Sequence, residues 1–370
     1  MSRLHAAPAG APAGSPAAGF GLPTRLGVRI AGTGVALPAD LVDNAKLAET
    51  VDTNDEWIRK RTGIAARRVA SDDDSVVTLG ADALRLAMDD AGIEGAALDL
   101  VLVATMTGAM SCPSSAARVA AAVGAKPAGA MDVVAACSGY VYALNLASTL
   151  IESGRYRRIG IVGAEVMTRH LNFDDRRTCV LFGDGAGAAV LERVETDGAA
   201  GGNPAGAAEL PGCVYQSMGS DGDAWEALYL PRRMADVPDS IDTSVHTEPG
   251  WNGKLDTLQM EGREVFKFAV VKICDLIDEA LDAAGLDAAD LKLVIPHQSN
   301  RRIMATAQHR FGLPEEKLYI NIDRFGNTSA ASVAICLDEV RRAGRVAPGD
   351  WVLFIAIGGG MSWGCSLWRM

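Results

Sequence analysis

Residues 82–104, DALRLAMDDAGIEGAALDLVLVA, align without a gap with residues 275–297, DLIDEALDAAGLDAADLKLVIPH. Each copy has apolar residues at helical spacing, then a glycine where a helix would end, then a short apolar run typical of a buried strand. A second pair of segments, residues 137–155 and 327–345, also aligns, and both members end in Gly-Arg. The two pairs indicate an internal duplication in which Cys137 and Asn327 occupy equivalent turns.

The rest of the chain also alternates strands with helices. Apolar runs predict strands at residues 27–34, 98–105, 130–136, 158–165 and 187–194, and helical spacing predicts helices at 81–92 and 114–123. This alternation predicts parallel sheets with helices on their faces. The fold class is therefore α/β, with two halves related by a pseudo-twofold axis and a shared site where strand ends converge between them.

Composition divides the chain into four parts. Residues 1–25 are Ala/Pro/Gly-rich, and we expect a disordered leader because prolines interrupt any apolar segment of signal-peptide length. Residues 26–195 are the first half, 196–212 a linker and 213–370 the second half. Within the second half, the polar residues 235–253 are expected to form a surface excursion.

Charge and cysteine content exclude several kinds of protein. A formal net charge of −11 argues against nucleic-acid binding, which needs a concentrated basic surface. The seven cysteines are odd in number and lack C-x-x-C spacing, which favours reduced thiols over disulfides or a zinc site. No run approaches the roughly 18 apolar residues of a membrane span. We therefore expect a cytoplasmic protein that binds no metal, membrane or nucleic acid.

Cys137 lies between an apolar run and a predicted helix, in the small-residue context AACSG. At such a turn the sulfur would lie near unpaired N–H groups and the positive end of the helix dipole, which both favour a thiolate. A buried structural cysteine is an equal alternative for Cys137. We prefer that structural interpretation for Cys274 and Cys336, which fall on predicted helices.

His297 and Asn327 are the other candidates. His297 ends the predicted strand LKLVIPH, where Pro296 indicates that the strand stops and opens into a site. Asn327 precedes a predicted helix, so a helix cap is the simplest interpretation of the residue alone. Its equivalence to Cys137 favours a functional role, because the duplicated turns would direct both side chains to one interface.

The glycine run IGGGMSWG, residues 357–364, can present backbone N–H groups without side-chain obstruction. It suits an oxyanion hole, and a tight turn between two strands is the alternative. The glycines of GTGVAL, GDGAGAAV and IGGGMS do not complete G-x-G-x-x-G between a strand and a helix, so a dinucleotide site is not favoured.

Several motifs occur in one order with Cys137, His297 and Asn327: DTNDEWIRKRTGI, FGDGAGAAVL, HQSNRR, GNTSAAS and GGGMSWG. Together they closely resemble the β-ketoacyl-acyl carrier protein synthase III family of the thiolase superfamily, from about Gly27 to Met370. The resemblance implies a layered α-β-α-β-α thiolase-like fold. It also implies a homodimer that uses no metal or nicotinamide cofactor.

The resemblance implies a two-step reaction that begins fatty acid synthesis. Cys137 would take an acyl group from acyl-CoA, with its own N–H and that of Gly359 as the oxyanion hole. Malonyl-acyl carrier protein would then lose CO2, with His297 and Asn327 donating hydrogen bonds to its thioester oxygen, and the enolate would attack the acyl group. The products would be β-ketoacyl-acyl carrier protein, CoA and CO2.

The resemblance also implies binding residues. The CoA contacts would be Thr53, Trp57, Arg61, Arg176 and Asn300. The docking surface for the acyl carrier protein would comprise Lys267, Gln298, Ser299, Asn300, Arg301 and Arg302. A salt-bridged helix surface is the alternative for Trp57 and Arg61, and a solvated run of charges is the alternative for the docking residues.

Four positions depart from the family pattern. Cys112 stands where Phe is usual, in the loop expected to close the partner's acyl pocket, and Ile357 replaces Phe before the glycine run. Arg177 replaces a Gly in the CoA loop, and His309 replaces a docking Lys. The smaller side chain of Cys112 predicts acceptance of acyl groups longer or bulkier than acetyl.

Three alternatives to fatty acid initiation remain at this point. One is a paralogous ketosynthase or acyltransferase of a secondary-metabolite pathway with a different acceptor. Another is a non-catalytic scaffold that binds carrier protein or CoA. A Cys-His hydrolase is the third, although it does not explain Asn327 at the position equivalent to the nucleophile.

Overall fold

The computed structural model describes residues 26–194, 210–244 and 251–370. The expected leader, residues 1–25, lies outside the described residues, as do 195–209 of the linker region and 245–250 of the excursion.

Two sheets form the frame of the molecule. The first has the order β1-β7-β6-β4-β5 and the second has the order β11-β12-β13-β8. The strands of the first sheet are β1 (Gly27–Ala36), β4 (Leu100–Ala104), β5 (Gly129–Val133), β6 (Arg158–Glu165) and β7 (Gly185–Val194). Those of the second are β8 (Gly212–Ser220), β11 (Leu291–Pro296), β12 (Trp351–Gly358) and β13 (Ser362–Arg369).

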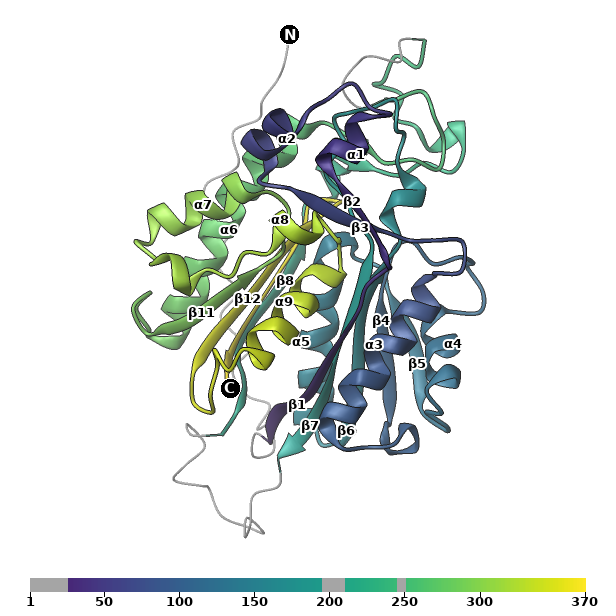
Figure 1. Cartoon of the computed structure of the whole chain (residues 1–370). Coiled ribbons are helices and arrows are strands. Elements are labelled where there is room, and N and C mark those ends of the chain that lie inside the picture. Colours follow the sequence, from purple (N-terminus) through teal and green to yellow (C-terminus); the bar gives the residue numbers. More distant parts are fainter. Residues whose placement is uncertain (1–25, 195–209, 245–250) are drawn as a thin grey trace.

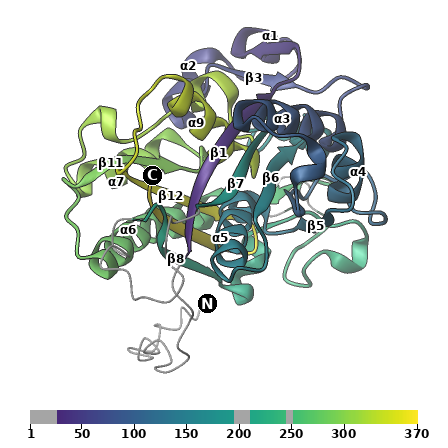
Figure 2. The ribbon, with the colours of Figure 1, turned by 90° about the horizontal axis from the view of Figure 1, so that it is seen from below.

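Three layers of helices cover these sheets. Helices α3 (Val76–Ala91) and α4 (Ser115–Ala122) pack outside the first sheet, and α6 (Gly262–Ala284) packs outside the second beside α7 (Arg301–Arg310). Helices α5 (Gly139–Glu152) and α9 (Ala331–Arg342) lie between the sheets and contact both. Figure 1 and Figure 2 place α4 and α6 on opposite flanks of the molecule. The expected α-β-α-β-α layering is confirmed.

Short elements complete the chain, several of them in the upper part of Figure 1. They are β2 (Asp40–Asp43), α1 (Asn44–Ala48), α2 (Asp55–Thr62), β3 (Ala66–Val69), β9 (Leu228–Tyr229), β10 (Gln259–Met260) and α8 (Ile322–Phe325). No described helix is long and apolar enough to cross a bilayer. The described residues also contain no group of three or more His, Cys, Asp or Glu residues placed to hold a metal ion.

The strand order supports the duplication. Reading each sheet from one edge, β1-β7-β6-β4 corresponds to β8-β13-β12-β11. The first sheet then adds β5, whereas the second has only an isolated bridge between Val294 and Leu318 at that position. The second half therefore retains a remnant of the fifth strand.

The prediction of parallel sheets is only partly right. Strand β4 pairs in parallel with β5 and β6, and β11 pairs in parallel with β12. The pairs β1·β7, β6·β7, β12·β13 and β13·β8 are antiparallel. The glycine run that joins β12 to β13 is too short for the crossover connection that a parallel pair needs. The two strands therefore pair antiparallel.

Helix α3 begins earlier than the predicted residue 81. Ser75 accepts a hydrogen bond from the N–H of Thr78, and the hydroxyl of Thr78 accepts one from the N–H of Ser75. This capping box uses Thr in place of the usual Glu or Gln, so the sequence pattern did not reveal it. The predicted glycine ends are confirmed, because Gly92 and Gly285 close α3 and α6 in left-handed conformations.

Two glycines set the depth at which α9 packs. Gly163 of β6 and Gly187 of β7 are directly opposite each other in the sheet. A Cβ at Gly163 would lie 2.4 Å from the carbonyl oxygen of Ala330, and one at Gly187 would lie 2.6 Å from the Cβ of Ala334. Helix α9 can therefore approach the first sheet only because this pair has no side chains.

We expect Gly187→Ala to lower the free energy of unfolding by about 1–3 kcal/mol, because the added methyl group overpacks the contact between β7 and α9. Chemical denaturation of the purified protein measures this change. Gly222→Ala is the matched control, since a Cβ there meets no atom within 4 Å. Equal stability of the two variants would show that the close approach of α9 is not a constraint.

Candidate active site

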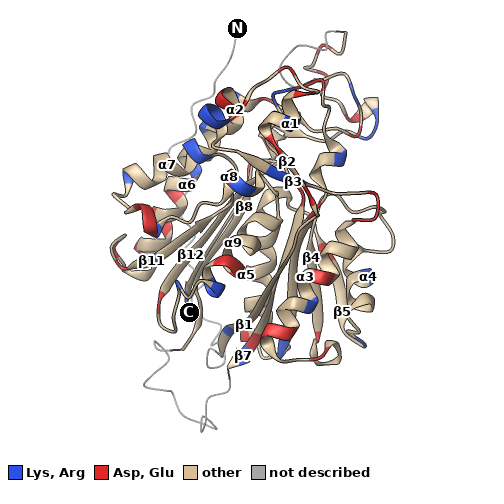
Figure 3. Cartoon of the chain, in the orientation of Figure 1, with Lys and Arg blue, Asp and Glu red and all other residues tan. Residues whose placement is uncertain are grey.

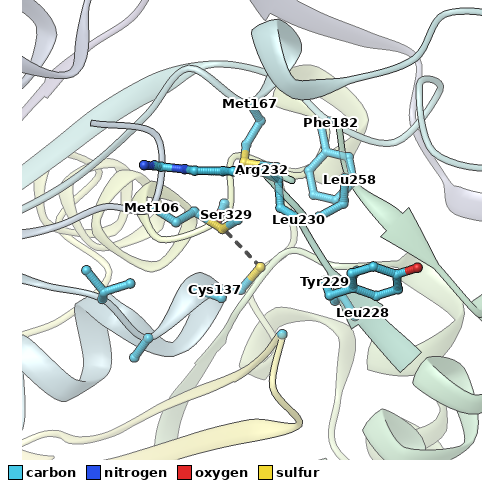
Figure 4. A pocket seen from close by; sticks show the side chains of 14 residues that line it. Met106, Cys137, Met167, Phe182, Leu228, Tyr229, Leu230, Arg232, Leu258 and Ser329 are labelled. Carbon is cyan, nitrogen blue, oxygen red and sulfur yellow. Dashed lines mark hydrogen bonds between the residues drawn. The ribbon is translucent and has the colours of Figure 1, made fainter. Parts of the chain in front are cut away.

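Cys137 lies in a 3-10 turn, Ala136–Ser138, between β5 and α5. The preceding residue, Ala136, has a φ of 45°, which L-amino acids rarely adopt, so the turn is strained. The Cys137 side chain is buried, and its Sγ lies 3.5 Å from the Oγ of Ser329. Figure 4 shows this pair at the wall of a cavity formed by segments far apart in the sequence.

The turn does not hold Cys137 as a thiolate. Burial raises the pKa of Cys137 to about 12, and the neighbouring carboxyl of Glu165 acts in the same direction. The hydrogen bond with Ser329 opposes this shift but is weaker than the effect of burial. A backbone hydrogen bond at the turn lowers the pKa of Cys137, in the direction that the sequence predicts, but desolvation outweighs it.

His297 follows directly after β11, as the sequence predicts. Its Nδ1 lies 2.7 Å from the Oγ of Ser332, which also accepts a hydrogen bond from the N–H of Gln298 at 3.4 Å. Burial lowers the pKa of His297 to about 3, so the imidazole is neutral near pH 7. If the Ser332 hydroxyl donates to Nδ1, the ring proton is on Nε2.

Asn327 is not a helix cap, because α9 begins four residues later and has Ala330 at its N-cap. Its Oδ1 accepts the N–H of Ser329 at 2.8 Å. An isolated parallel β-bridge pairs the backbone of Asn327 with that of Phe182. With Oδ1 engaged, the Nδ2 amide protons are the donors that Asn327 can offer to a ligand.

Three neighbouring cavities share their walls. The first, about 340 Å³ in volume, is mainly apolar and is lined by Cys137 and Gly359. The second, about 110 Å³, brings together Cys137, His297 and Asn327. The third is a larger cleft of about 1130 Å³. The first and second cavities share three wall residues, Cys137, Phe182 and Leu228. The second cavity and the cleft share five wall residues: Leu181, Met260, Gly262, Phe266 and Asn300.

The glycine run approaches the thiol turn closely. A Cβ at Gly358 would lie 2.8 Å from the backbone nitrogen of Cys137, so only glycine fits there. Gly359 lines the apolar cavity beside Cys137. The same run connects β12 and β13, so the interpretation as a tight turn is confirmed, and the oxyanion hole stays a prediction.

The large cleft contains most of the residues expected to bind CoA. The guanidinium carbons of Arg61 and Arg176 lie 4.7 and 5.3 Å from the centroid of the Trp57 ring. The basic residues that line the cleft are Arg61, Arg176, Arg177, Arg263, Lys267 and Arg302. Figure 3 shows Lys and Arg on α2 and α7 at this side of the molecule. Glu261 and Glu264 also line the cleft, but the basic residues outnumber them, so the cleft suits an anion with a flat ring.

Thr53 does not join the other CoA candidates. It is not among the residues that line the cleft, and its Oγ1 is buried without a hydrogen-bond partner among the described residues. Asn300 lines both the cleft and the middle cavity, and its Nδ2 donates to the carbonyl oxygen of Arg61 at 3.1 Å. Thr62, which the sequence did not single out, does line the cleft.

The expected docking residues differ in accessibility. Gln298 is fully buried, where its amide donates to the carbonyl oxygens of Pro296 and Tyr319. Its inclusion in the docking surface is therefore wrong, because its side chain holds the loop after β11 together. Arg301 and Arg302 are exposed, Lys267 lines the large cleft and Ser299 lines the middle cavity.

The expected acyl-pocket residues also separate. Ile357 lines the middle cavity, whereas Cys112 is exposed and lines none of the three cavities in the single chain. The sequence missed the walls of the apolar cavity, above all residues 228–230, whose LYL run lies beside the expected surface excursion. The sequence prediction also missed Glu165, although an acidic residue at the end of an apolar strand indicates a candidate site residue.

Comparison with known proteins is consistent with this geometry. Residues 131–203 match the family model described as 3-Oxoacyl-[acyl-carrier-protein (ACP)] synthase III, and residues 281–370 match the corresponding C-terminal model. The β-ketoacyl-[acyl-carrier-protein] synthase III of Erythrobacter litoralis is 43% identical over 340 residues, which is 92% of this chain and 98% of that protein. That of Caldanaerobacter subterraneus is 41% identical over 343 residues, or 93% and 98% of the two chains.

Solved structures are similar over the same extent. The synthase III of Aquifex aeolicus has a TM-score of 0.81 at 37% identity, covering 93% of this chain and all of its own. The priming β-ketosynthase from the R1128 polyketide pathway has a TM-score of 0.80 at 35% identity, covering 94% of this chain and 98% of its own. The chain belongs to the β-ketoacyl-acyl carrier protein synthase III family.

We expect the His297 imidazole to stay neutral between about pH 5 and pH 8, because a buried ring with so low a pKa gains no proton there. Nitrogen-15 NMR of histidine-labelled protein measures this, and His297→Gln assigns the signals. A titration midpoint near the ordinary value of 6.5 would contradict the burial argument.

Proposed function

We propose that this member of the family is a condensing acyltransferase that initiates fatty acid synthesis. It transfers an acyl group from acyl-CoA to Cys137, then condenses that group with malonyl-acyl carrier protein. The observation that carries the proposal is the series of three cavities, in which a basic cleft leads past His297 and Asn327 to Cys137 and an apolar cavity.

In the loading step, Cys137 attacks the acyl thioester. The N–H groups of Cys137 and Gly359 stabilise the oxyanion, since the glycine run borders the thiol turn. The acyl chain enters the apolar cavity, and the CoA nucleotide occupies the basic cleft. There Trp57 stacks on the adenine between Arg61 and Arg176, and the other cations of the cleft pair with phosphates.

In the condensing step, His297 and Asn327 act as hydrogen-bond donors to the malonyl thioester oxygen. A neutral imidazole with Nε2–H and an amide with free Nδ2 protons both suit this task. Both donors strengthen their interaction as loss of CO2 places negative charge on that oxygen. This chemistry requires neither a metal nor a nicotinamide, because the chain itself supplies the nucleophile and the donors.

The acyl carrier protein docks at the mouth of the cleft. Arg301 and Arg302 are exposed on the first turn of α7, and Lys267 lines the cleft on the neighbouring helix α6, where it pairs with Glu264. Their charge complements an acidic carrier surface. Ser299 and Asn300 lie further in, where they would meet the thioester arm rather than the carrier's surface.

The chain functions as a homodimer through the free edge of β5. Strand β5 ends the first sheet, and the nearby side chains of Met110, Met131 and Val134 are 47%, 42% and 75% exposed. An apolar, unpaired strand edge is suited to pairing with a second copy. Val134 also lines the apolar cavity, so a partner at this edge would place its loop around Cys112 near that cavity.

A ketosynthase that primes polyketide synthesis is the second candidate. The structural similarity to the R1128 priming enzyme favours it. The two candidates share the loading step and differ in the acceptor, so the mass of the product formed with each carrier protein distinguishes them. A scaffold would form no acyl-enzyme, and a Cys-His hydrolase would release free acid.

We expect Cys137→Ala to abolish acyl loading and to slow condensation by at least about a thousandfold, because no other group replaces the nucleophile. Intact mass spectrometry across an acyl-CoA panel detects loading, and carbon dioxide release with malonyl-acyl carrier protein measures condensation. Cys336→Ala, at a buried cysteine of α9, is the matched control and should load normally. Condensation retained by the Cys137→Ala variant would refute the proposal.

We expect the wild-type enzyme to accept acyl groups longer or bulkier than acetyl, and Cys112→Phe to lower kcat/KM for them by about tenfold or more relative to acetyl-CoA. The reason is that a larger side chain narrows the partner's apolar cavity. Steady-state kinetics across a chain-length series provides the measurement. Wild-type turnover confined to acetyl-CoA would contradict the role of Cys112.

A further inference from the structure

Glu165 is a fully buried carboxyl group that the proposed chemistry leaves unused. It ends β6, and burial raises its pKa to about 7. The turn after β4 surrounds it with donors: the hydroxyl groups of Thr105 and Thr107 and the N–H groups of Met106 and Thr107. One further donor comes from the opposite half of the molecule, the hydroxyl of Ser329 at 3.1 Å.

Ser329 links Glu165 to the thiol. Its Oγ accepts a hydrogen bond from the Sγ of Cys137 at 3.5 Å and donates one to the Oε1 of Glu165. The φ of Ser329 is 49°, in a region where a non-glycine residue costs roughly 1–2 kcal/mol. Glycine would be the least strained residue at this position, yet the chain places a hydroxyl there. The backbone N–H of Ser329 is fixed by Asn327, so the hydroxyl is held between thiol and carboxyl.

We propose that Glu165, acting through Ser329, takes up the proton of Cys137 when the thiol attacks the acyl thioester and returns it when condensation frees the sulfur. This inference rests on the proposed function, because it assigns a proton path to the same two steps. Glu165 does not touch the substrate and is a positioning residue that acts on the thiol through one hydroxyl group.

The bonds and protons balance in the loading step. As Sγ bonds to the acyl carbon, its proton moves to the Oγ of Ser329 and the Ser329 proton moves to Oε1 of Glu165. The bond between the acyl carbon and the CoA sulfur breaks, and the CoA thiolate leaves and takes a proton from solvent. Glu165 is then neutral while Cys137 carries the acyl group.

The condensing step reverses the transfer. The malonyl carboxylate leaves as CO2, the enolate carbon bonds to the acyl carbon, and the bond from that carbon to Sγ breaks. The sulfur leaves as a thiolate and recovers its proton from Glu165 through Ser329. One proton is consumed per cycle, from solvent by CoA, and no oxidant or reductant is needed.

The other groups at the site are less suited to this task. The buried His297 is a poor proton acceptor because its pKa is about 3. A carboxyl group with a pKa near 7 can hold or release a proton under the same conditions. The Glu165 site is also enclosed, so a proton held there is kept away from bulk water.

A purely structural role, as an anchor for residues 105–107, is the competing explanation, and three variants separate the two roles. Glu165→Gln removes the proton acceptor, and Ser329→Gly removes the hydroxyl while relieving the backbone strain. In the native protein the hydroxyl of Thr105 donates a hydrogen bond to Oε2 of Glu165 at 3.2 Å. Thr105→Val removes this hydrogen bond and leaves the link from Glu165 through Ser329 to Cys137 in place. If Glu165→Gln fails to fold, Ser329→Gly still tests the path.

The experiment measures single-turnover acylation of Cys137 by acetyl-CoA and octanoyl-CoA with rapid quenching and intact mass, as a function of pH. Alkylation by iodoacetamide is measured in parallel. We expect Glu165→Gln and Ser329→Gly to slow both reactions at neutral pH by about a hundredfold. The loss should shrink as pH rises, because hydroxide can then remove the thiol proton directly. Thr105→Val should lower the melting temperature and slow both reactions far less than the other two variants, because it raises the pKa of Glu165 without interrupting the link to Cys137.

Two results would overturn the inference: unchanged rates in Glu165→Gln and Ser329→Gly, or the same rate loss in Thr105→Val. Failure of the proposed function has a different signature, because wild-type Cys137 would then acquire no acyl mass from either acyl-CoA. Alkylation needs no acyl-CoA, so slower alkylation of Glu165→Gln or Ser329→Gly would still support the proton path in that case.

Discussion

The site depends on one shared layer of packing, formed by α5 and α9 between the two sheets. Because each helix packs on both sheets, the turns that precede them come to the same end of the molecule. One turn carries Cys137 and the other carries Asn327 and Ser329. The depth of α9, set by the opposed glycines of β6 and β7, therefore also determines how far the hydroxyl of Ser329 lies from the thiol.

Desolvation decides the chemical state of the groups inside this frame. The outer cleft is open and basic, so it attracts anions. Deeper in, burial raises the pKa of Cys137 and lowers that of His297, which leaves both side chains neutral at rest. A site of this kind works by directing hydrogen-bond donors and moving protons over short distances.

Much of this arrangement could be predicted from local pattern. The duplication, the glycine ends of α3 and α6, the strand end at His297 and the turn at Cys137 all follow from periodicity and composition. Other features depend on long-range packing that no local pattern encodes. The thiol's protonation depends on burial by both halves, and the buried Gln298 could not be told from an exposed neighbour by type alone. Four of the seven strand pairs in the two main sheets are antiparallel, and this pairing depends on tertiary contacts. So does the cavity wall formed by residues 228–230.

The two halves differ at one edge of their sheets. In the first half β5 leaves a full strand edge free, whereas in the second half the equivalent position holds only the bridge between Val294 and Leu318. Two equivalent free edges on one chain would let copies add head to tail without limit, as in a fibre. The second sheet ends instead at β11, which the chain's own segment bridges at Leu318, so a second copy that pairs with β5 would not meet an equivalent edge on the other half.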